Sequence, residues 1–158
     1  MSHIHEKIDF TADAFIVNGD KVLLRMHDKY NMWLQVGGHI ELDEDPLQSL
    51  FKEIKEECGL EVELLIKSQK TFQAKGYKDL PVPQFMLRHP VNNTHEHINL
   101  MYVVKALTVD IQPDPAEKPV EFKWFTSKEL QDPQYRVAEH VQYYAARALE
   151  FAKQYGHA

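Results

Sequence analysis

The pattern of apolar and polar residues along the chain predicts alternating strands and helices. Apolar and β-branched residues dominate 10–17 and 21–26, and the intervening Asn18-Gly19-Asp20 contains an Asn-Gly pair, a strong signal for a tight hairpin turn. We therefore predict a β-hairpin at the start of the chain. Glycine, proline and asparagine within 75–96 indicate that this stretch is partly loop. Further strands are predicted at 60–66, 69–74, 84–88, 97–108 and 120–125.

Two helices are predicted from capping residues and from apolar spacing. The first has Asp45 as its N-cap, Pro46 at the first helical position, Gln48 as capping-box partner and Gly59 after its last turn. Its apolar stripe consists of Leu47, Leu50, Phe51, Ile54 and Cys58. The second helix runs from about 134 to 155 and docks by one face. Strands flanked by helices predict an α/β/α sandwich with a mixed β-sheet.

Length and composition predict one domain over 1–158. A chain of 158 residues with 44% hydrophobic and 27% charged residues, and without a repeat or linker, can fold alone. The single Cys58 excludes an internal disulfide framework, and the first residues contain neither a secretory apolar region nor a membrane span, so we expect a cytoplasmic location. A net charge of −6 argues against binding long nucleic acids but allows a small anionic ligand.

The first predicted helix carries an arc of acidic side chains beside its apolar stripe. Glu53, Glu56 and Glu57 fall on this arc, and each like-charge pair costs about 0.2–0.5 kcal/mol. Two of these glutamates also lie in the last turn, where the helix dipole disfavours negative charge by roughly 0.3–1 kcal/mol. A hard divalent cation such as Mg²⁺ or Mn²⁺ resolves both conflicts.

The competing interpretation of the acidic arc is a solvated helix face, which is the usual case for an isolated Glu-x-x-Glu-Glu. The residues before the helix shift the balance. Gly37-Gly38 form a turn whose bare backbone can approach a phosphate or offer a carbonyl to a metal ion. We therefore favour a metal site over a surface patch.

The run from Gly38 to Leu60 resembles the Nudix box. The motif positions Gly38, Glu44, Glu53, Glu56, Glu57 and Gly59 all occur at the required spacing, with Ile54 and Leu60 as the aliphatic residues. One departure is Lys52, which replaces an arginine of the family and offers a point charge instead of a planar fork. A softer departure is Val36, where many members carry proline.

The resemblance implies a Nudix-like α/β/α sandwich with a loop-helix-loop catalytic motif and a metal-dependent pyrophosphohydrolase activity. It implies metal binding by Glu56, Glu57 and the Gly38 carbonyl, and a ligand or base role for Glu53. Glu44 then has an orienting or metal-shell role, and Lys52 has the orienting role of the family's arginine. The expected cofactor is Mg²⁺ or Mn²⁺, and activated water would attack phosphorus in a small nucleoside diphosphate derivative.

Other candidate residues have competing interpretations. Glu96 is a candidate distal metal ligand, and His95 and His97 share one strand face, where a polar strand entrance is favoured over a ligand role. Candidate substrate contacts are Arg25, Gly37, His39 and Trp33, with Tyr30 as a second stacking aromatic and core packing as the alternative for Trp33. Solvation is favoured for Lys75, Lys78 and Arg88, and burial is favoured for Cys58 over a nucleophilic role.

Two other functions remain open on the sequence. A Nudix domain that binds a nucleotide-like ligand without turnover is suggested by Lys52 alone. A Nudix-fold isomerase of prenyl diphosphates ranks low because it needs a catalytic cysteine with a matching glutamate. The substrate is not encoded in any readable motif, since specificity depends on loops such as 75–96. The long final helix also offers a surface for a homodimer.

Overall fold

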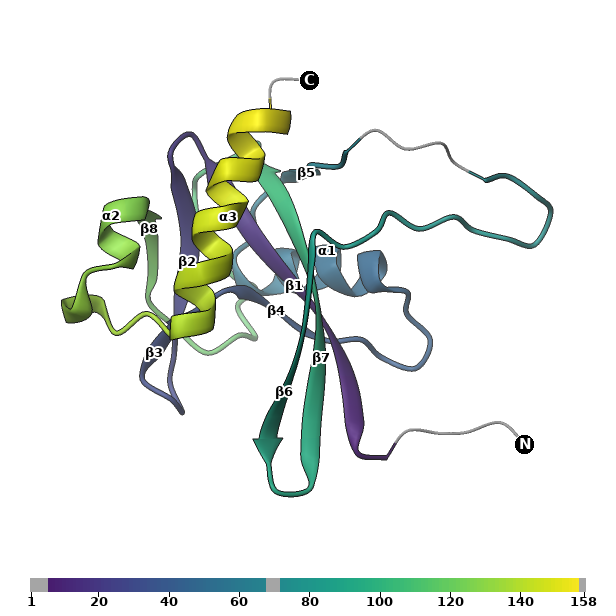
Figure 1. Ribbon diagram of the computed structural model, residues 1–158, viewed down its shortest axis with the longest axis horizontal. Coiled ribbons are helices and arrows are strands. Elements are labelled where there is room, and N and C mark those ends of the chain that lie inside the picture. Colours follow the sequence, from purple (N-terminus) through teal and green to yellow (C-terminus); the bar gives the residue numbers. More distant parts are fainter. Residues whose placement is uncertain (1–5, 68–71, 157–158) are drawn as a thin grey trace.

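The computed structural model describes residues 6–67 and 72–156 of the chain. In these residues one eight-stranded mixed sheet lies between α1 and α3 (Figure 1). The elements in chain order are β1 (Ile8–Asn18), β2 (Lys21–His27), β3 (Met32–Leu34), β4 (Val36–His39), α1 (Pro46–Glu57), β5 (Val62–Leu64), β6 (Phe85–Asn92), β7 (His95–Ala106), β8 (Phe122–Thr126), α2 (Ser127–Leu130), the 3₁₀ turn η1 (Pro133–Tyr135) and α3 (Glu139–Tyr155).

Strand β1 pairs with β7 along one edge and with β4 and then β2 along the other. It runs parallel to β7 along most of its length, while the other strand pairs are antiparallel. The first part of β1 pairs with β4, where Thr11 lies opposite His39 and Ala12 opposite Gly38. The last part pairs with β2, where Ile16 lies opposite Leu23. This pairing therefore holds the paired glycines of β4 against the middle of β1.

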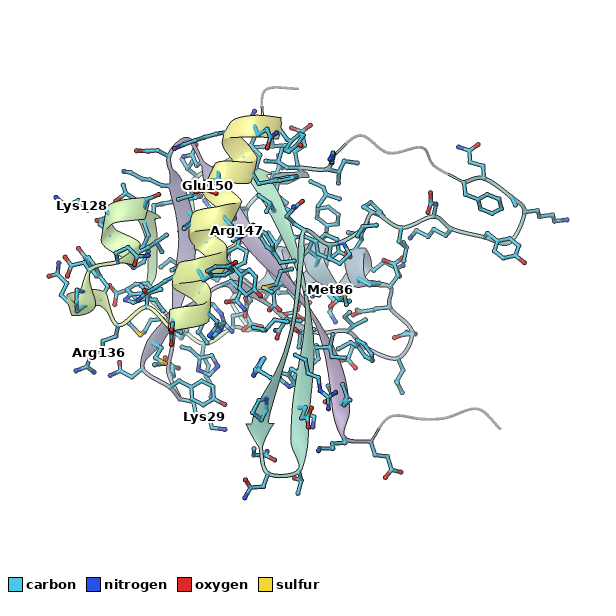
Figure 2. The ribbon with its side chains drawn as sticks, viewed as in Figure 1. Lys29, Met86, Lys128, Arg136, Arg147 and Glu150 are labelled. Carbon is cyan, nitrogen blue, oxygen red and sulfur yellow. The ribbon has the colours of Figure 1, made fainter. Side chains whose placement is uncertain are left out.

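The strand alternation divides the apolar side chains between two cores. On one face Phe15, Met101 and Val103 pack with buried residues of α3. On the other face Ile16 and Val104 pack with the buried stripe of α1. Arg147 and Glu150 are exposed on the outer surface of α3, away from the sheet (Figure 2). These observations confirm the predicted sandwich with a mixed sheet.

The first helix begins and ends as predicted. The Asp45 carboxylate accepts hydrogen bonds from the N–H groups of Leu47 and Gln48, and the Gln48 side chain accepts from the N–H of Asp45. Helix α1 ends at Glu57, and Gly59 follows with a φ of +67°. Within the predicted stripe Leu50, Ile54 and Cys58 are buried, but Phe51 is 41% exposed, so its assignment to the core was wrong.

The remaining elements differ from the sequence pattern mainly in their bounds. The hairpin is confirmed as β1 and β2, while β6 extends to Asn92 through the stretch expected to be partly loop. The strand predicted at 69–74 is wrong for residues 72–74, and its other residues lie outside the described part. The last helix starts at Glu139 because η1 and the left-handed Arg136 (φ +51°) interrupt the helical path before it.

Two further predictions concern the whole chain. No helix in the described residues is long and apolar enough to cross a membrane. The single domain over 1–158 and the cytoplasmic location stay predictions.

Candidate active site

The paired glycines of β4 lie directly against the acidic side of α1. The Gly37 N–H donates a hydrogen bond to Oε2 of Glu57 at 3.1 Å. Gly37 has a φ of +150°, and a Cβ there would lie 2.5 Å from the carbonyl oxygen of Ala12. A Cβ at Gly38 would lie 2.6 Å from the carboxyl carbon of Glu53. Both glycines are therefore required for the close approach of strand and helix.

Glu57 is buried beside one cation. Its side chain accepts from Gly37 and forms an ion pair with Nη2 of Arg25 at 2.8 Å, and the residue is 8% exposed. Burial raises the pKa of Glu57 to about 7, against the opposing effects of Arg25 and Gly37. Burial also raises the pKa of Glu53, and the charge of Glu56 raises it further. The site thus gathers more negative charge than Arg25 neutralises.

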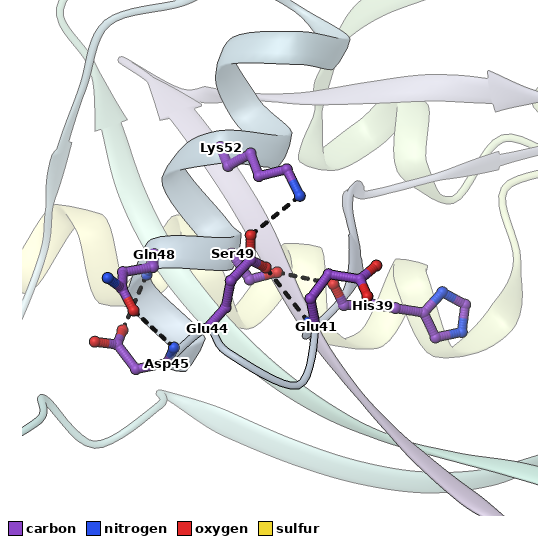
Figure 3. A network of polar contacts seen from close by, with 7 residues as sticks. All are labelled: His39, Glu41, Glu44, Asp45, Gln48, Ser49 and Lys52. Carbon is purple, nitrogen blue, oxygen red and sulfur yellow. Dashed lines mark hydrogen bonds and ion pairs between the residues drawn. The ribbon is translucent and has the colours of Figure 1, made fainter.

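A polar network fixes the loop between β4 and α1 (Figure 3). Nζ of Lys52 donates to Oε1 of Glu44 at 3.0 Å, and Oε2 of Glu44 accepts from the N–H of Glu41 at 3.4 Å. The buried hydroxyl of Ser49 donates to the carbonyl of His39 at 3.0 Å, which ties α1 to the end of β4. Lys52 therefore orients Glu44, while Ser49 holds the glycine strand in place.

A cleft of about 620 Å³ opens beside the glycines, a size that suits a small-molecule ligand. Two predicted catalytic or metal-binding side chains, Glu53 and Glu57, line it. The predicted substrate contacts Arg25, Gly37 and His39 line it as well. Arg25 and Glu57 also border a second hollow of about 460 Å³ that includes Glu117. The Arg25–Glu57 ion pair therefore borders both hollows.

The floor of the cleft is a buried hydrogen-bond network. Nδ2 of Asn99 donates to Oδ2 of Asp13 at 2.6 Å and to Oγ1 of Thr11 at 2.7 Å. The Thr11 hydroxyl donates to the same Asp13 oxygen at 2.8 Å. Burial raises the pKa of Asp13, although its bonds to Asn99 and Thr11 act in the opposite direction. The network presents polar groups to a ligand inside a largely apolar fold.

Unpartnered polar atoms point to ligand binding in the same cleft. In the described residues, buried side-chain atoms without a hydrogen-bond partner occur on four residues, all of which line the cleft: Nε of Arg25, Nδ1 of His27, Oε1 of Gln35 and Oδ1 of Asn99. Each such atom costs about 1–3 kcal/mol when no partner is provided. Their concentration in one place indicates that a ligand or ordered water supplies the missing partners.

Five predicted site residues do not line the cleft: Glu44 and Lys52 of the loop network, and Trp33, Glu56 and Glu96. Trp33 is 4% exposed and packs edge-on against Phe125 with ring centroids 5.0 Å apart, so its predicted stacking on a base was wrong. The aromatic residue at the cleft is Tyr30, which stacks on His27. Glu56 is half-buried but does not line the cleft.

Glu96 is also absent from the cleft lining. It is held by Nζ of Lys7 at 2.9 Å and by Nε of Arg88 at 2.5 Å, which lower its pKa to about 2. Glu96 lies outside the cleft because successive residues of a strand point to opposite faces of the sheet, so His95 and His97 share the face opposite to Glu96. The structure therefore favours an ion pair over the distal metal role predicted for Glu96.

Sequence reasoning missed the floor residues although a signal was present. Thr11 and Asp13 occur two residues apart within the apolar middle of one strand, and Asn99 stands between Ile98 and Leu100 in another. A buried polar residue needs a partner, so these interruptions indicate a network. For Cys58, burial raises the pKa of the thiol to about 11, as expected for a structural residue.

The family model for the NUDIX domain matches residues 8–146 of the chain. The chain belongs to the Nudix family. A hydrolase of the NUDIX family from Clostridium perfringens is 30% identical in sequence, with a TM-score of 0.76, and the alignment covers 90% of this chain and 96% of that one. The predicted family, fold and class of enzyme, a Nudix-type pyrophosphohydrolase, are therefore confirmed.

More distant structures share the Nudix fold. A possible diadenosine tetraphosphate hydrolase from Jonesia denitrificans is 20% identical, with a TM-score of 0.67 and coverage of 94% of this chain and 97% of that one. An ADP-ribose pyrophosphatase from Streptococcus suis is 21% identical, with a TM-score of 0.56 and coverage of 90% of both chains. No curated protein matches the chain by sequence.

Proposed function

We propose that this Nudix enzyme uses Mg²⁺ or Mn²⁺ to cleave a diphosphate linkage in a nucleoside diphosphate derivative. The observation that carries the proposal is the placement of Glu53 and Glu57 against Gly37 and Gly38 at one side of the cleft. The J. denitrificans and S. suis neighbours are described as acting on diadenosine tetraphosphate and ADP-ribose. Both molecules join a nucleoside through phosphates to another group, which supports this substrate class.

The side chains present suit a hard divalent cation. Burial raises the pKa of Glu57 to about 7 and raises that of Glu53. The ionised carboxylates are therefore destabilised in the metal-free protein, and a bound cation would stabilise them. Carboxylate and backbone carbonyl oxygens are the ligands that Mg²⁺ prefers. We assign metal binding to Glu53, Glu56, Glu57 and the Gly38 carbonyl. When bound, the metal supplies charge neutralisation at the phosphates and a lowered pKa for water.

The remaining residues position the substrate and the attacking water. Glu53 is half-buried at the cleft surface and is the group suited to accept a proton from water as it attacks phosphorus. Glu44, fixed by Lys52, holds the loop before α1 in place relative to Glu53. Asp13 lies beside Gly37, and the unpartnered Oδ1 of Asn99 offers an acceptor to the nucleoside part of the substrate.

The test is turnover of a defined substrate panel by the full chain. ADP-ribose, a UDP-sugar, diadenosine tetraphosphate and nucleoside triphosphates are incubated with Mg²⁺ in ¹⁸O-labelled water. We expect product release on at least one substrate, with label in one phosphate product. Glu57→Gln is expected to reduce the rate by a factor on the order of 10² or more. The matched control Glu63→Gln changes an exposed glutamate of β5 and is expected to retain activity.

A second candidate is a Nudix domain that binds its nucleotide-like ligand without turnover. Lys52 favours it, because its ammonium is a point charge that binds Glu44 without the planar fork of the arginine that the family carries at this position. Ligand binding by calorimetry, together with no product from any substrate of the panel, would support this candidate and contradict the first.

A further inference from the structure

A second group of potential metal ligands lies on three strands at the edge of the cleft. In the described residues, Asp9 of β1, His39 of β4, and His95 and His97 of β7 bring one ligand atom each to within 4.8 Å of the other three. The sheet register explains this meeting. Asp9 lies directly opposite His97, and His39 lies opposite Thr11, two residues further along β1.

The ligand atoms converge on a small volume. Nε2 of His39 lies 3.1 Å from Nε2 of His97, and Oδ2 of Asp9 lies 3.1 Å from Nε2 of His95. The same Asp9 oxygen is 3.8 Å from Nε2 of His39. Ligand atoms on one tetrahedral zinc ion are about 3.3 Å apart, given Zn–N distances of about 2.0–2.1 Å. The distances of 3.1, 3.1 and 3.8 Å lie within about 0.5 Å of that value, and all four ligand atoms lie within 4.8 Å of one another.

The ring orientations agree with ligands that radiate from one centre. The His39 and His97 rings are 4.9 Å apart between centroids with an interplanar angle of 88°. The His95 and His97 rings are 5.0 Å apart, also at 88°. The competing arrangement is a set of pairwise hydrogen bonds, which joins two atoms at a time and does not require three imidazole nitrogens and one carboxylate oxygen to share one space.

The chemistry of this donor set differs from that of the Nudix glutamates. Three imidazole nitrogens and one carboxylate oxygen suit Zn²⁺, Co²⁺, Ni²⁺ or Cu²⁺, whereas Mg²⁺ prefers oxygen ligands. His39 directly follows Gly38, so the two donor sets stand next to each other along β4. We propose that Asp9, His39, His95 and His97 bind one transition-metal ion, with Zn²⁺ as the representative, separately from the acidic site.

An ion with four protein ligands has a structural role. It joins the end of β4 to β1 and β7, which are the strands that frame the glycine turn and the cleft floor. Since the ion binds the folded chain and the ligands are dispersed in the unfolded chain, it raises the midpoint of thermal unfolding in proportion to its affinity and concentration.

The test is metal binding by the metal-stripped, tag-free full chain in the presence of excess Mg²⁺. Titration calorimetry with ZnCl₂ is expected to give one ion per chain, and CoCl₂ is expected to give the intense visible absorption of tetrahedral Co²⁺. Zn²⁺ is also expected to raise the melting temperature. His97→Ala and His39→Ala should each weaken Zn²⁺ binding by a factor of at least about 10 and abolish the melting shift.

Matched controls separate this site from other ligands in the chain. His140→Ala removes a histidine whose ring stacks on His89 outside the four ligands, and Glu57→Gln alters the acidic site; both should retain Zn²⁺ binding. A double variant of His3 and His5 to alanine should also retain it. The proposal is overturned by an absence of Zn²⁺ binding, by its retention in His97→Ala and His39→Ala, or by its loss in any of the three controls.

Discussion

The backbone N–H of Gly37 donates to the buried carboxylate of Glu57 at 3.1 Å, across the junction of β4 and α1. This bond connects residues twenty positions apart and joins the residue just before the Nudix box to the end of its helix. It also explains why burial raises the pKa of Glu57 only to about 7, since Gly37 and Arg25 both stabilise the ionised form.

Glu57 is expected to make the metal-free enzyme less stable as the pH rises. Its pKa is about 7 in the folded chain and 4.5 ordinarily, so between these values the folded chain binds more protons than the unfolded chain. The free energy of unfolding therefore falls across this window, by roughly 2–3 kcal/mol at most from this group. Urea unfolding in EDTA at pH 5 and pH 8 measures the change.

The variant Glu57→Gln isolates this contribution. His97 has a pKa lowered to about 4 and therefore adds stability as the pH rises from about 4 to 6.5, which opposes the effect of Glu57. Both proteins contain His97, so their difference reports on Glu57. We expect the variant to gain stability over the parent at pH 8. An equal pH dependence in the two proteins would contradict the buried, proton-binding carboxylate.

Substitutions of the paired glycines are expected to separate activity from stability. At Gly38 an added Cβ meets the carboxyl group of Glu53, the movable end of a side chain, so Gly38→Ala should displace the carboxylate and leave the fold intact. A misplacement of about 1 Å lowers the rate on the order of 10²-fold. At Gly37 the added Cβ meets the backbone of Ala12 and Asp13, so Gly37→Ala should lower the melting temperature as well.

Steady-state kinetics and thermal unfolding of both glycine variants, beside the parent, provide the measurement. Equal losses of melting temperature in Gly37→Ala and Gly38→Ala would show that the contact between Gly38 and Glu53 is not specific to the active site.

Lys52 is expected to affect turnover through Glu44. The ammonium is exposed and its single described ion pair holds Glu44 in the loop before α1. Lys52→Met should therefore lower kcat severalfold with little change in melting temperature, since surface ion pairs contribute little to stability. Lys52→Arg should retain activity because a guanidinium can bind the same carboxylate. A higher kcat in Lys52→Arg than in the parent would indicate that lysine limits the enzyme.

The sequence predicted the parts of the site that depend on local rules. Capping by Asp45 and Pro46 fixes where α1 begins, and the motif spacing then places Glu53 and Glu57 beside the paired glycines. The floor depends on a different kind of information. Asn99 meets Asp13 across 86 positions of sequence, and only the parallel register of β1 and β7 brings them together. No local pattern encodes that register.

Glu96 and Trp33 illustrate the same limit. Glu96 was assigned to the metal shell by its place in the chain, but a shift of one residue along a strand reverses the face, and the structure places His97 at the cleft instead. Trp33 and Tyr30 are equally plausible stacking residues in sequence. The burial of Trp33 depends on its packing against Phe125 from β8, some ninety residues away.

The contrast between these two aromatics gives the final prediction. Trp33 is buried against Phe125, so Trp33→Ala should lower the free energy of unfolding by about 3–5 kcal/mol. Tyr30 is 48% exposed at the cleft, so Tyr30→Ala should leave the unfolding transition nearly unchanged. If its ring stacks on the base of the substrate, a contact worth about 1–3 kcal/mol, KM should rise about tenfold or more with a smaller change in kcat. Denaturant unfolding and kinetics on both variants, with Tyr30→Phe as the matched control that keeps the ring, distinguish the two roles. An unchanged KM in Tyr30→Ala would exclude stacking at this position and leave the polar floor as the recognition surface.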